Sequence, residues 1–321
     1  MYQSSSSNWS NAESCKPPSC RSIVVKVGLF AGIVSKLKWF AAMGYLALVF
    51  QLTGCSGLSL YNKMVPSETN VDIAASDLAY GQAPRQRLDI YKPQSNPRAA
   101  PVIVFFYGGS WNSGRKEDYA FAGNAFAARG FVVVVADYRL VPKIRFPTFL
   151  EDCALAVAWV HTNIATFGGD PDRLFLLGHS AGAYNAAMLA LDSRYLENVG
   201  LSTRAIRGVA ALAGPFDFLP LDVDSTQAAF SNAPDANQTQ PIHFVSKTAP
   251  PLFLATGDED TTVKPRNSQQ LAERLRLTGG KVVLKTYPGI GHVSILLAIS
   301  TAFRSRAPVV DDVINFFEAT R

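Results

Sequence analysis

The chain has 321 residues, of which 48% are hydrophobic and 17% are charged, which is enough for one large domain with a buried core. Its formal net charge is +5, but residues 1–54 hold five basic residues and one acidic residue and so carry +4, which leaves +1 for the remainder. A charge this small is too little for an electrostatic nucleic-acid surface, so we expect no nucleic-acid partner.

The start of the chain has the pattern of a secretory signal. Lys36 and Lys38 precede an apolar run from Trp39 to Phe50, and small residues follow before Cys55. The sequence Leu-Thr-Gly-Cys that ends at Cys55 resembles the lipobox of bacterial lipoproteins. In those proteins the cysteine becomes the new N-terminus, and its thiolate takes a diacylglyceryl group that anchors the protein to a membrane.

We therefore predict a leader at 1–54, a tether at 55–69 and a single folded domain at 70–321. The expected location is extracytoplasmic, with the protein attached to a bacterial membrane through the lipid on Cys55. Ser56 resembles the residue of the outer-membrane sorting class, which favours the outer over the inner membrane. An uncleaved membrane anchor within 23–50 is the alternative to this interpretation.

The cysteines indicate no disulfide. Cys15 and Cys20 would leave with the leader, and Cys55 would carry the lipid. Cys153 lies in a helical pattern, where we expect it to be a small core residue.

Apolar patterning predicts strands that alternate with helices. The alternation of Leu88 and Ile90 with polar residues indicates an antiparallel edge strand over 86–91. Further strands are expected at 101–106, 131–136, 174–177, 206–212, 251–255 and 281–287. Helices are expected at 118–129, 148–166, 183–191, 265–277 and 309–317. This order predicts the α/β class with a doubly wound, mostly parallel sheet. The stretch 215–250 has no clear period, and its Phe-rich part, 216–244, is expected to form a small cap or lid, or the wall of an acyl pocket. Its aromatic residues are expected either in that wall or in the core of the cap.

The stretch Gly178-His179-Ser180-Ala181-Gly182 lies between a predicted strand and a predicted helix. In that context the G-x-S-x-G pattern marks a sharp turn, because two glycines leave room for a strained serine whose hydroxyl stands above the sheet. We predict that Ser180 is a nucleophile, and an ordinary glycine-rich turn is the alternative.

A serine hydroxyl attacks only when a base lies within hydrogen-bond reach and a third group orients that base. With this motif the order along the chain is Ser, then Asp or Glu, then His. His161 and His179 are out of order, and His243 precedes the acid candidates. His292, in a glycine-rich loop after the last predicted strand, is therefore the predicted base.

The acid is expected on the loop after the strand at 251–255, which contains Asp258, Glu259 and Asp260. We predict Asp260, because a tight turn that opens at Gly257 would direct it toward the active-site end of the sheet. Asp258 is expected to cap that turn with its own side chain.

The negative charge that develops on a substrate oxygen needs donors that are fixed in advance. The N–H of Ala181, near the start of a helix, is one predicted donor. The loop Tyr-Gly-Gly-Ser-Trp at 107–111 follows a buried strand, and its glycines let backbone N–H groups approach a substrate. Gly109 and Ser110 are the other predicted donors, and a simple Gly-Gly turn is the alternative.

Six motifs occur in the order that is seen in α/β-hydrolase carboxylesterases: YGGSW at 107–111, DYRL at 137–140, GGDP at 168–171, GHSAG at 178–182, GDEDTTV at 257–263 and GIGH at 289–292. The chain resembles the branch of bacterial feruloyl esterases, near the hormone-sensitive-lipase-like and isoprenylcysteine-methylesterase-like enzymes. The resemblance implies the α/β-hydrolase fold, ester hydrolysis through an acyl-enzyme and no metal or cofactor. It also supports Ser180, Asp260 and His292.

The chain departs from the H-G-G-G form of this loop, because Tyr107 replaces the histidine and Ser110 replaces the last glycine, and this variant resembles members of the feruloyl-esterase branch. We expect Tyr107 to anchor its loop by packing or through its hydroxyl. The stretch 137–139 is expected to brace loops through ion pairs, with Arg139 bound to Glu151 or Asp152.

These features predict a serine carboxylesterase for small or aryl esters. One alternative is an arylformamidase similar to kynurenine formamidase, because the same three residues serve amide hydrolysis. The other is a non-catalytic binding protein on a hydrolase scaffold. No pattern in the sequence predicts an oligomeric state.

Overall fold

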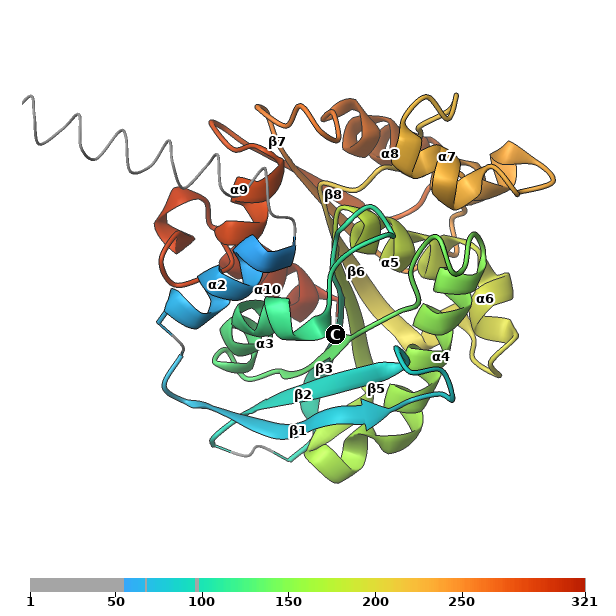
Figure 1. The fold of residues 1–321 in the computed structure, drawn as a ribbon. Coiled ribbons are helices and arrows are strands. Elements are labelled where there is room, and N and C mark those ends of the chain that lie inside the picture. Colours follow the sequence, from blue (N-terminus) through green and yellow to red (C-terminus); the bar gives the residue numbers. More distant parts are fainter. Residues whose placement is uncertain (1–54, 67, 96–97, 321) are drawn as a thin grey trace, which may run out of the picture. The chain divides into compact units, whose positions relative to one another are not determined.

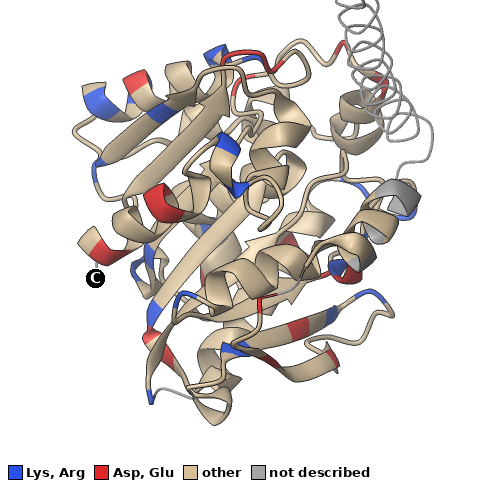
Figure 2. Cartoon of the chain, turned by 90° about the vertical axis from the view of Figure 1, so that its left-hand side faces the viewer, with Lys and Arg blue, Asp and Glu red and all other residues tan. Residues whose placement is uncertain are grey.

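The computed structural model describes residues 55–320 apart from 67, 96 and 97. The predicted leader lies outside the described residues. Within the described part, no helix is long and apolar enough to cross a membrane. Basic and acidic residues are interspersed on the strands and helices of this part (Figure 2).

The described residues build an eight-stranded sheet with the spatial order β1-β2-β4-β3-β5-β6-β7-β8 (Figure 1). The strands are β1 (Val71–Ala79), β2 (Arg87–Pro93), β3 (Ala100–Phe106), β4 (Val132–Ala136), β5 (Gly169–His179), β6 (Ile206–Leu212), β7 (Leu252–Gly257) and β8 (Val282–Tyr287). Strand β2 is antiparallel to both neighbours, and the strands from β4 to β8 are parallel. The predicted mostly parallel sheet is confirmed, and the loops after β3, β5, β7 and β8 meet at its carboxyl edge.

The strand predicted at 86–91 is β2, and it is antiparallel as expected, but its predicted edge position is wrong. Strand β1, which we did not predict, pairs with β2 and forms the edge. Every residue of β1 is at least partly exposed, and its pairing has two register irregularities. An edge strand of this kind lacks the strong apolar alternation that identifies a strand in a sequence.

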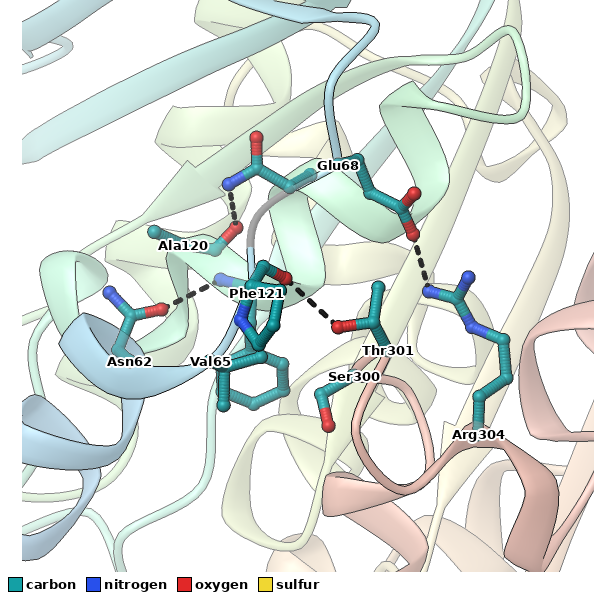
Figure 3. Close-up of a pocket in the computed structure, with 10 residues that line it drawn as sticks. Asn62, Val65, Glu68, Ala120, Phe121, Ser300, Thr301 and Arg304 are labelled. Atoms are coloured by element: carbon teal, nitrogen blue, oxygen red, sulfur yellow. Dashed lines mark hydrogen bonds and ion pairs between the residues drawn. The ribbon is translucent and has the colours of Figure 1, made fainter.

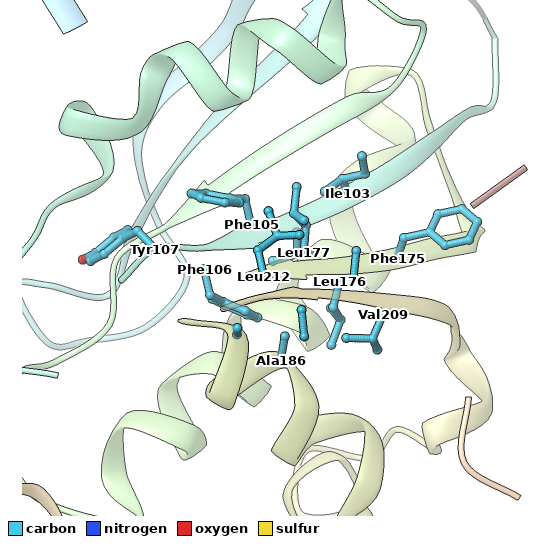
Figure 4. Packing of buried hydrophobic residues seen from close by; sticks show 14 of the residues in the cluster. Ile103, Phe105, Phe106, Tyr107, Phe175, Leu176, Leu177, Ala186, Val209 and Leu212 are labelled. Carbon is cyan, nitrogen blue, oxygen red and sulfur yellow. The ribbon is translucent and has the colours of Figure 1, made fainter. Parts of the chain in front are cut away.

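Helices cover both faces of the sheet. Phe105 and Phe106 are neighbours on β3 and point to opposite faces (Figure 4). Ala186 of α5 (Ala181–Leu191) lies on the side of Phe106, and Phe317 of α10 (Val309–Ala319) stacks on Phe175 with 4.5 Å between ring centroids. Burial on both faces explains why the parallel strands are continuous apolar runs.

The helices are α2 (Cys55–Met64), α3 (Ala120–Ala127), α4 (Thr148–Asn163), α5 (Ala181–Leu191), α6 (Ser193–Glu197), α7 (Asp224–Phe230), α8 (Arg266–Leu277), α9 (His292–Leu297) and α10 (Val309–Ala319). Short 3-10 turns are η1 (Lys116–Tyr119), η2 (Ile164–Phe167), η3 (Thr203–Ala205), η4 (Ala236–Thr239), η5 (Pro241–Phe244) and η6 (Arg304–Arg306). Cys153 of α4 is fully buried and free, as predicted.

The segment predicted as a cap contains α7, η4 and η5. Phe230 at the end of α7 is buried and packs edge-on against Trp111, with ring centroids 4.8 Å apart. Phe218 is partly buried and lines a pocket that also contains Ser180. The aromatic residues of this segment are therefore both the core of the cap and a wall of the pocket.

Part of the segment predicted as a tether is folded. The hydroxyl of Tyr61 in α2 lies 2.5 Å from the Ser300 hydroxyl, and Glu68, beyond this helix, pairs with Arg304 at 2.8 Å. We call residues 58–66 and Glu68 the strap. Figure 3 shows Asn62 and Val65 of the strap beside Phe121, and Glu68 beside Arg304. The strap therefore contacts the turn after α9, the helix that begins at His292.

Candidate active site

Ser180 lies at the predicted sharp turn between β5 and α5, with φ 54° and ψ −121°. This left-handed conformation is strained for a residue with a side chain. A Cβ on Gly178 would lie 2.2 Å from the carbonyl oxygen of Gly182, and one on Gly182 would lie 2.0 Å from that of Phe106. Only glycine fits at either position, which explains the spacing of the motif physically.

The turn brings Ser180 to the two other residues predicted for the site. His292 Nε2 lies 2.9 Å from Ser180 Oγ, and His292 Nδ1 lies 2.8 Å from Asp260 Oδ2. A carboxylate only accepts hydrogen bonds, so Nδ1 carries the proton and Nε2 accepts from the serine hydroxyl. The three residues come from the end of β5, the loop after β7 and the first residue of α9.

Asp260 is held by its own loop. Its Oδ1 accepts hydrogen bonds from the N–H groups of Thr262 and Val263 at 3.0 and 2.8 Å, which leaves Oδ2 for the imidazole. Its side chain is fully buried, whereas that of His292 is 12% exposed. A buried, oriented carboxylate can fix the tautomer of the histidine and stabilise its cation.

The expected role of Asp258 is wrong in one respect. Its Oδ1 accepts from the N–H of Gly289 at 2.7 Å, in the loop before α9, and the turn itself is closed by the Asp260 N–H bonded to the Gly257 carbonyl. Asp258 therefore links the acid loop to the histidine loop instead of capping its own turn.

Two of the three predicted oxyanion donors line the pocket beside Ser180, and the third lies just before it in the chain. Ser110 and Ala181 line the same pocket as Ser180. Ala181 is the first residue of α5, where N–H groups have no partner within the helix. Gly109, with φ 123°, precedes the pocket wall, and its carbonyl accepts from the N–H groups of Asn112 and Ser113.

Tyr107 fixes the start of the loop that carries Ser110. Its ring is stacked between Tyr119 and Tyr138, with centroids 4.9 and 5.0 Å away. Its hydroxyl donates to Asp137 at 2.5 Å and accepts from Arg85 at 2.7 Å. Burial raises the pKa of the Tyr107 phenol well above its usual value, so the hydroxyl keeps its proton. Tyr107 thus makes both kinds of contact that we expected.

Trp111, at the other end of the stretch 107–111, is also anchored. The Trp111 indole N–H donates to Oδ1 of Asn185, a residue of helix α5, at 3.1 Å.

Arg139 pairs with Asp152, one of its two expected partners, through two nitrogens at 2.7 and 2.9 Å. Neither Arg85 nor Asn185 belongs to a motif that we recognised, because each acts only through tertiary contacts.

A pocket of about 410 Å³ opens above Ser180. Apolar residues that line it come from the loop after β3 and from the cap: Trp111, Pro215, Phe218, Leu219, Pro220 and Val223. The cap also contributes the polar Asp222, Ser225 and Thr226, and 261–264, Arg266 and Asn267 line the pocket as well. Among the described residues, no group of three or more His, Cys, Asp or Glu side chains is arranged to hold a metal ion.

The parallel sheet, the left-handed serine and the meeting of the four loops define an α/β-hydrolase fold. Solved structures share this fold. Esterase B from Lactobacillus rhamnosis aligns with a TM-score of 0.72 at 19% identity, over 87% of this chain and 95% of that chain. A hyperthermophilic esterase from Pyrobaculum calidifontis aligns with a TM-score of 0.69 at 22% identity, over 86% and 94% of the two chains.

The family model BD-FAE matches residues 88–275, more than half of the chain, and the chain belongs to this family. Isoprenylcysteine alpha-carbonyl methylesterase ICME of Arabidopsis thaliana is 28% identical over 75% of this chain and 61% of its own length. Esterase LipC of Mycobacterium tuberculosis is 28% identical over 73% of this chain and 67% of its own. The chain thus spans about three fifths of the length of the first relative. The predicted family resemblance is confirmed.

Proposed function

We propose that this protein is a serine esterase that hydrolyses carboxylic esters through an acyl-enzyme on Ser180. The observation that carries the proposal is the chain of hydrogen bonds from Asp260 through His292 to Ser180, at 2.8 and 2.9 Å, beside an open pocket. The names of the relatives, esterases and methylesterases, agree with this chemistry.

In the proposed mechanism, Ser180 Oγ attacks the ester carbonyl carbon while His292 Nε2 takes its proton. Asp260 stabilises the imidazolium, and the N–H groups of Gly109, Ser110 and Ala181 receive the developing oxyanion. Each such donor contributes about 3–4 kcal/mol to transition-state stabilisation in comparable sites. His292 then protonates the leaving alcohol, and a water activated by the same nitrogen hydrolyses the acyl-enzyme.

We propose small or aryl esters as the substrate class. The pocket volume of about 410 Å³ lies in the range of small-molecule sites. Its wall on the side of the cap carries the aromatic side chains of Trp111 and Phe218, together with polar cap residues such as Asp222. Trp111 is held in place by Asn185, so this wall is rigid where it adjoins Ser110.

Steady-state hydrolysis of p-nitrophenyl esters with graded acyl chains tests the function. We expect turnover of the short and aryl esters by the wild type, and loss of about 10⁴-fold or more in kcat for Ser180→Ala. Faster hydrolysis of N-formylkynurenine than of any ester would identify an arylformamidase instead. No turnover of either class by a folded wild type would favour a binding protein.

We also propose that a lipid on Cys55 anchors the protein to a bacterial membrane, and to the outer membrane because Ser56 follows. Helix α2 begins at Cys55, and it exposes Leu60 and Met64, one turn apart, by 57% and 71%. Tyr61 lies on the inward face of the same helix. An apolar exposed stripe beside a lipidated residue would suit the surface of a bilayer.

Partition into the detergent phase of Triton X-114 tests the anchor in cells that process lipoproteins. We expect the wild type in the detergent phase and Cys55→Ala in the aqueous phase. Equal partition of the two proteins into the detergent phase would show that another segment binds the membrane.

A further inference from the structure

His179 lies immediately before the nucleophile, at a position that the G-x-S-x-G pattern leaves open. It is the last residue of β5 and is only 4% exposed. Its place in the chain excluded it as the base, and the proposed mechanism does not use it. A buried histidine beside the reacting serine calls for a physical explanation.

The hydrogen bonding of His179 fixes its tautomer. Its Nε2 lies 2.9 Å from the main-chain carbonyl oxygen of His292. A carbonyl only accepts, so Nε2 carries the proton and donates it. Nδ1 is then a bare acceptor, buried and without a hydrogen-bond partner among the described residues. An unsatisfied buried acceptor costs about 1–3 kcal/mol, so the position of this ring is not explained by stability alone.

The same ring lies beside the loop after β3. A Cβ on Gly108 would lie 3.0 Å from His179 Nδ1 and 3.0 Å from Ser180 Cβ. The rings of His179 and His292 are 4.9 Å apart between centroids. One side chain therefore adjoins the nucleophile, the oxyanion loop and the base.

His179 brings no charge to this position. Burial first, and the neighbouring His292 second, lower the pKa of His179 to about 3, although its backbone hydrogen bond and Asp260 act in the opposite direction. The ring is thus neutral at neutral pH. A cation at this place would oppose the positive charge that His292 acquires during the reaction.

We propose that His179 is a positioning residue that holds His292 between Asp260 and Ser180 by donating a hydrogen bond to the His292 carbonyl. The proposal rests on the proposed function for its kinetic consequences. The base is the first residue of a helix of only six residues, so a bond to its own carbonyl restrains the backbone where the imidazole is attached. Without the bond, the short helix can shift and the imidazole can leave the line between its two partners.

The test compares three variants of similar size. In His179→Gln the amide nitrogen takes the place of Nε2 and can donate to the same carbonyl. In His179→Asn the amide ends near Nδ1 and cannot reach it, and His179→Leu has no donor. We expect kcat to fall about three- to tenfold in the Asn and Leu variants, as for one lost hydrogen bond, with KM within about twofold of wild type. The Gln variant should retain most of the activity.

A spectroscopic measurement separates positioning from general loss of structure. The low-field proton resonance of the Nδ1–H bonded to Asp260 should be present in the wild type and the Gln variant and weakened in the other two. Thermal unfolding verifies that each variant is folded.

The proton resonance tests the geometry even if the wild type hydrolyses no ester, so failure of the proposed function is distinguishable from failure of this proposal. Wild-type kinetics and a wild-type resonance in the Asn and Leu variants would overturn the role of the hydrogen bond. Equal losses in all three variants would overturn it as well, because the Gln variant keeps the donor.

Discussion

At the scale of single residues, the hydrogen-bond partners of each carboxylate oxygen distinguish the acid of the site from its neighbour. Asp260 gives one oxygen to two N–H groups of its own loop and the other oxygen to His292. Asp258, two residues earlier, gives an oxygen to Gly289 and is exposed. Two carboxylates on one loop therefore have different expected roles.

Matched substitutions test this difference. Asp260→Asn should lower kcat by about 10³- to 10⁴-fold, because an amide can impose the wrong tautomer and does not stabilise the imidazolium. Asp258→Asn should change kcat by less than about tenfold, since it touches only the loop. Steady-state kinetics on p-nitrophenyl acetate provide the comparison, and equal losses in the two variants would contradict the assignment of Asp260.

Tyr107 is the second residue whose contacts lead to a prediction. Tyr107→Phe keeps the stacking on Tyr119 and Tyr138 but removes the hydroxyl from Asp137 and Arg85. Because Asp137 is buried, we expect the free energy of unfolding to fall by about 1–3 kcal/mol. KM should change little, because Tyr107 does not line the pocket. Urea unfolding monitored by fluorescence measures this loss, and an unchanged midpoint would show that packing alone anchors the loop.

At the scale of elements, most strands and helices could be predicted because burial on both faces gives β3, β4 and β7 continuous apolar sequences. Strand β1 could not, because an exposed edge places weak demands on its side chains. Helix α9 has only six residues, too few to show a helical period. The order of Ser180, Asp260 and His292 was predictable because a parallel sheet brings consecutive loops to one edge.

At this scale, the sharp turn between β5 and α5 can be tested through its glycines. Gly182→Ala would place a methyl group 2.0 Å from the Phe106 carbonyl oxygen, where β3 cannot move freely. We expect a loss of about 1–3 kcal/mol or more in the free energy of unfolding, or failure to fold. Gly291→Ala is the control, because its nearest neighbour is 3.5 Å away. Urea unfolding of both variants gives the comparison, and a similar midpoint for the two would contradict the steric account.

At the scale of the whole molecule, contacts between distant segments could not be read from the sequence. Arg85 reaches Tyr107 from the turn before β2, Asn185 holds Trp111, and the strap reaches the turn after α9. None of these pairs has a local pattern, because each depends on the packing of separately formed elements. The bond from His179 to the carbonyl of His292 is of the same kind.

Buried His179 also links global stability to pH. Its pKa is lowered to about 3 in the folded protein, against about 6.5 in an unfolded chain. As pH falls below 6.5 the unfolded state binds the proton first, so this group removes up to about 1.4 kcal/mol of stability per pH unit down to about pH 3. Urea unfolding between pH 7.5 and 5 should therefore show a steeper loss for the wild type than for His179→Gln. Parallel curves for the two proteins would contradict a buried neutral histidine.

The measurement that tests the central claim most directly is intact-mass analysis after treatment with a fluorophosphonate. This reagent modifies a serine only when a neighbouring base activates it. We predict one adduct per chain, located on Ser180, absent from Ser180→Ala and formed far more slowly in His292→Ala than in the control His161→Ala. An unmodified wild type, or an adduct on another residue, would contradict the account.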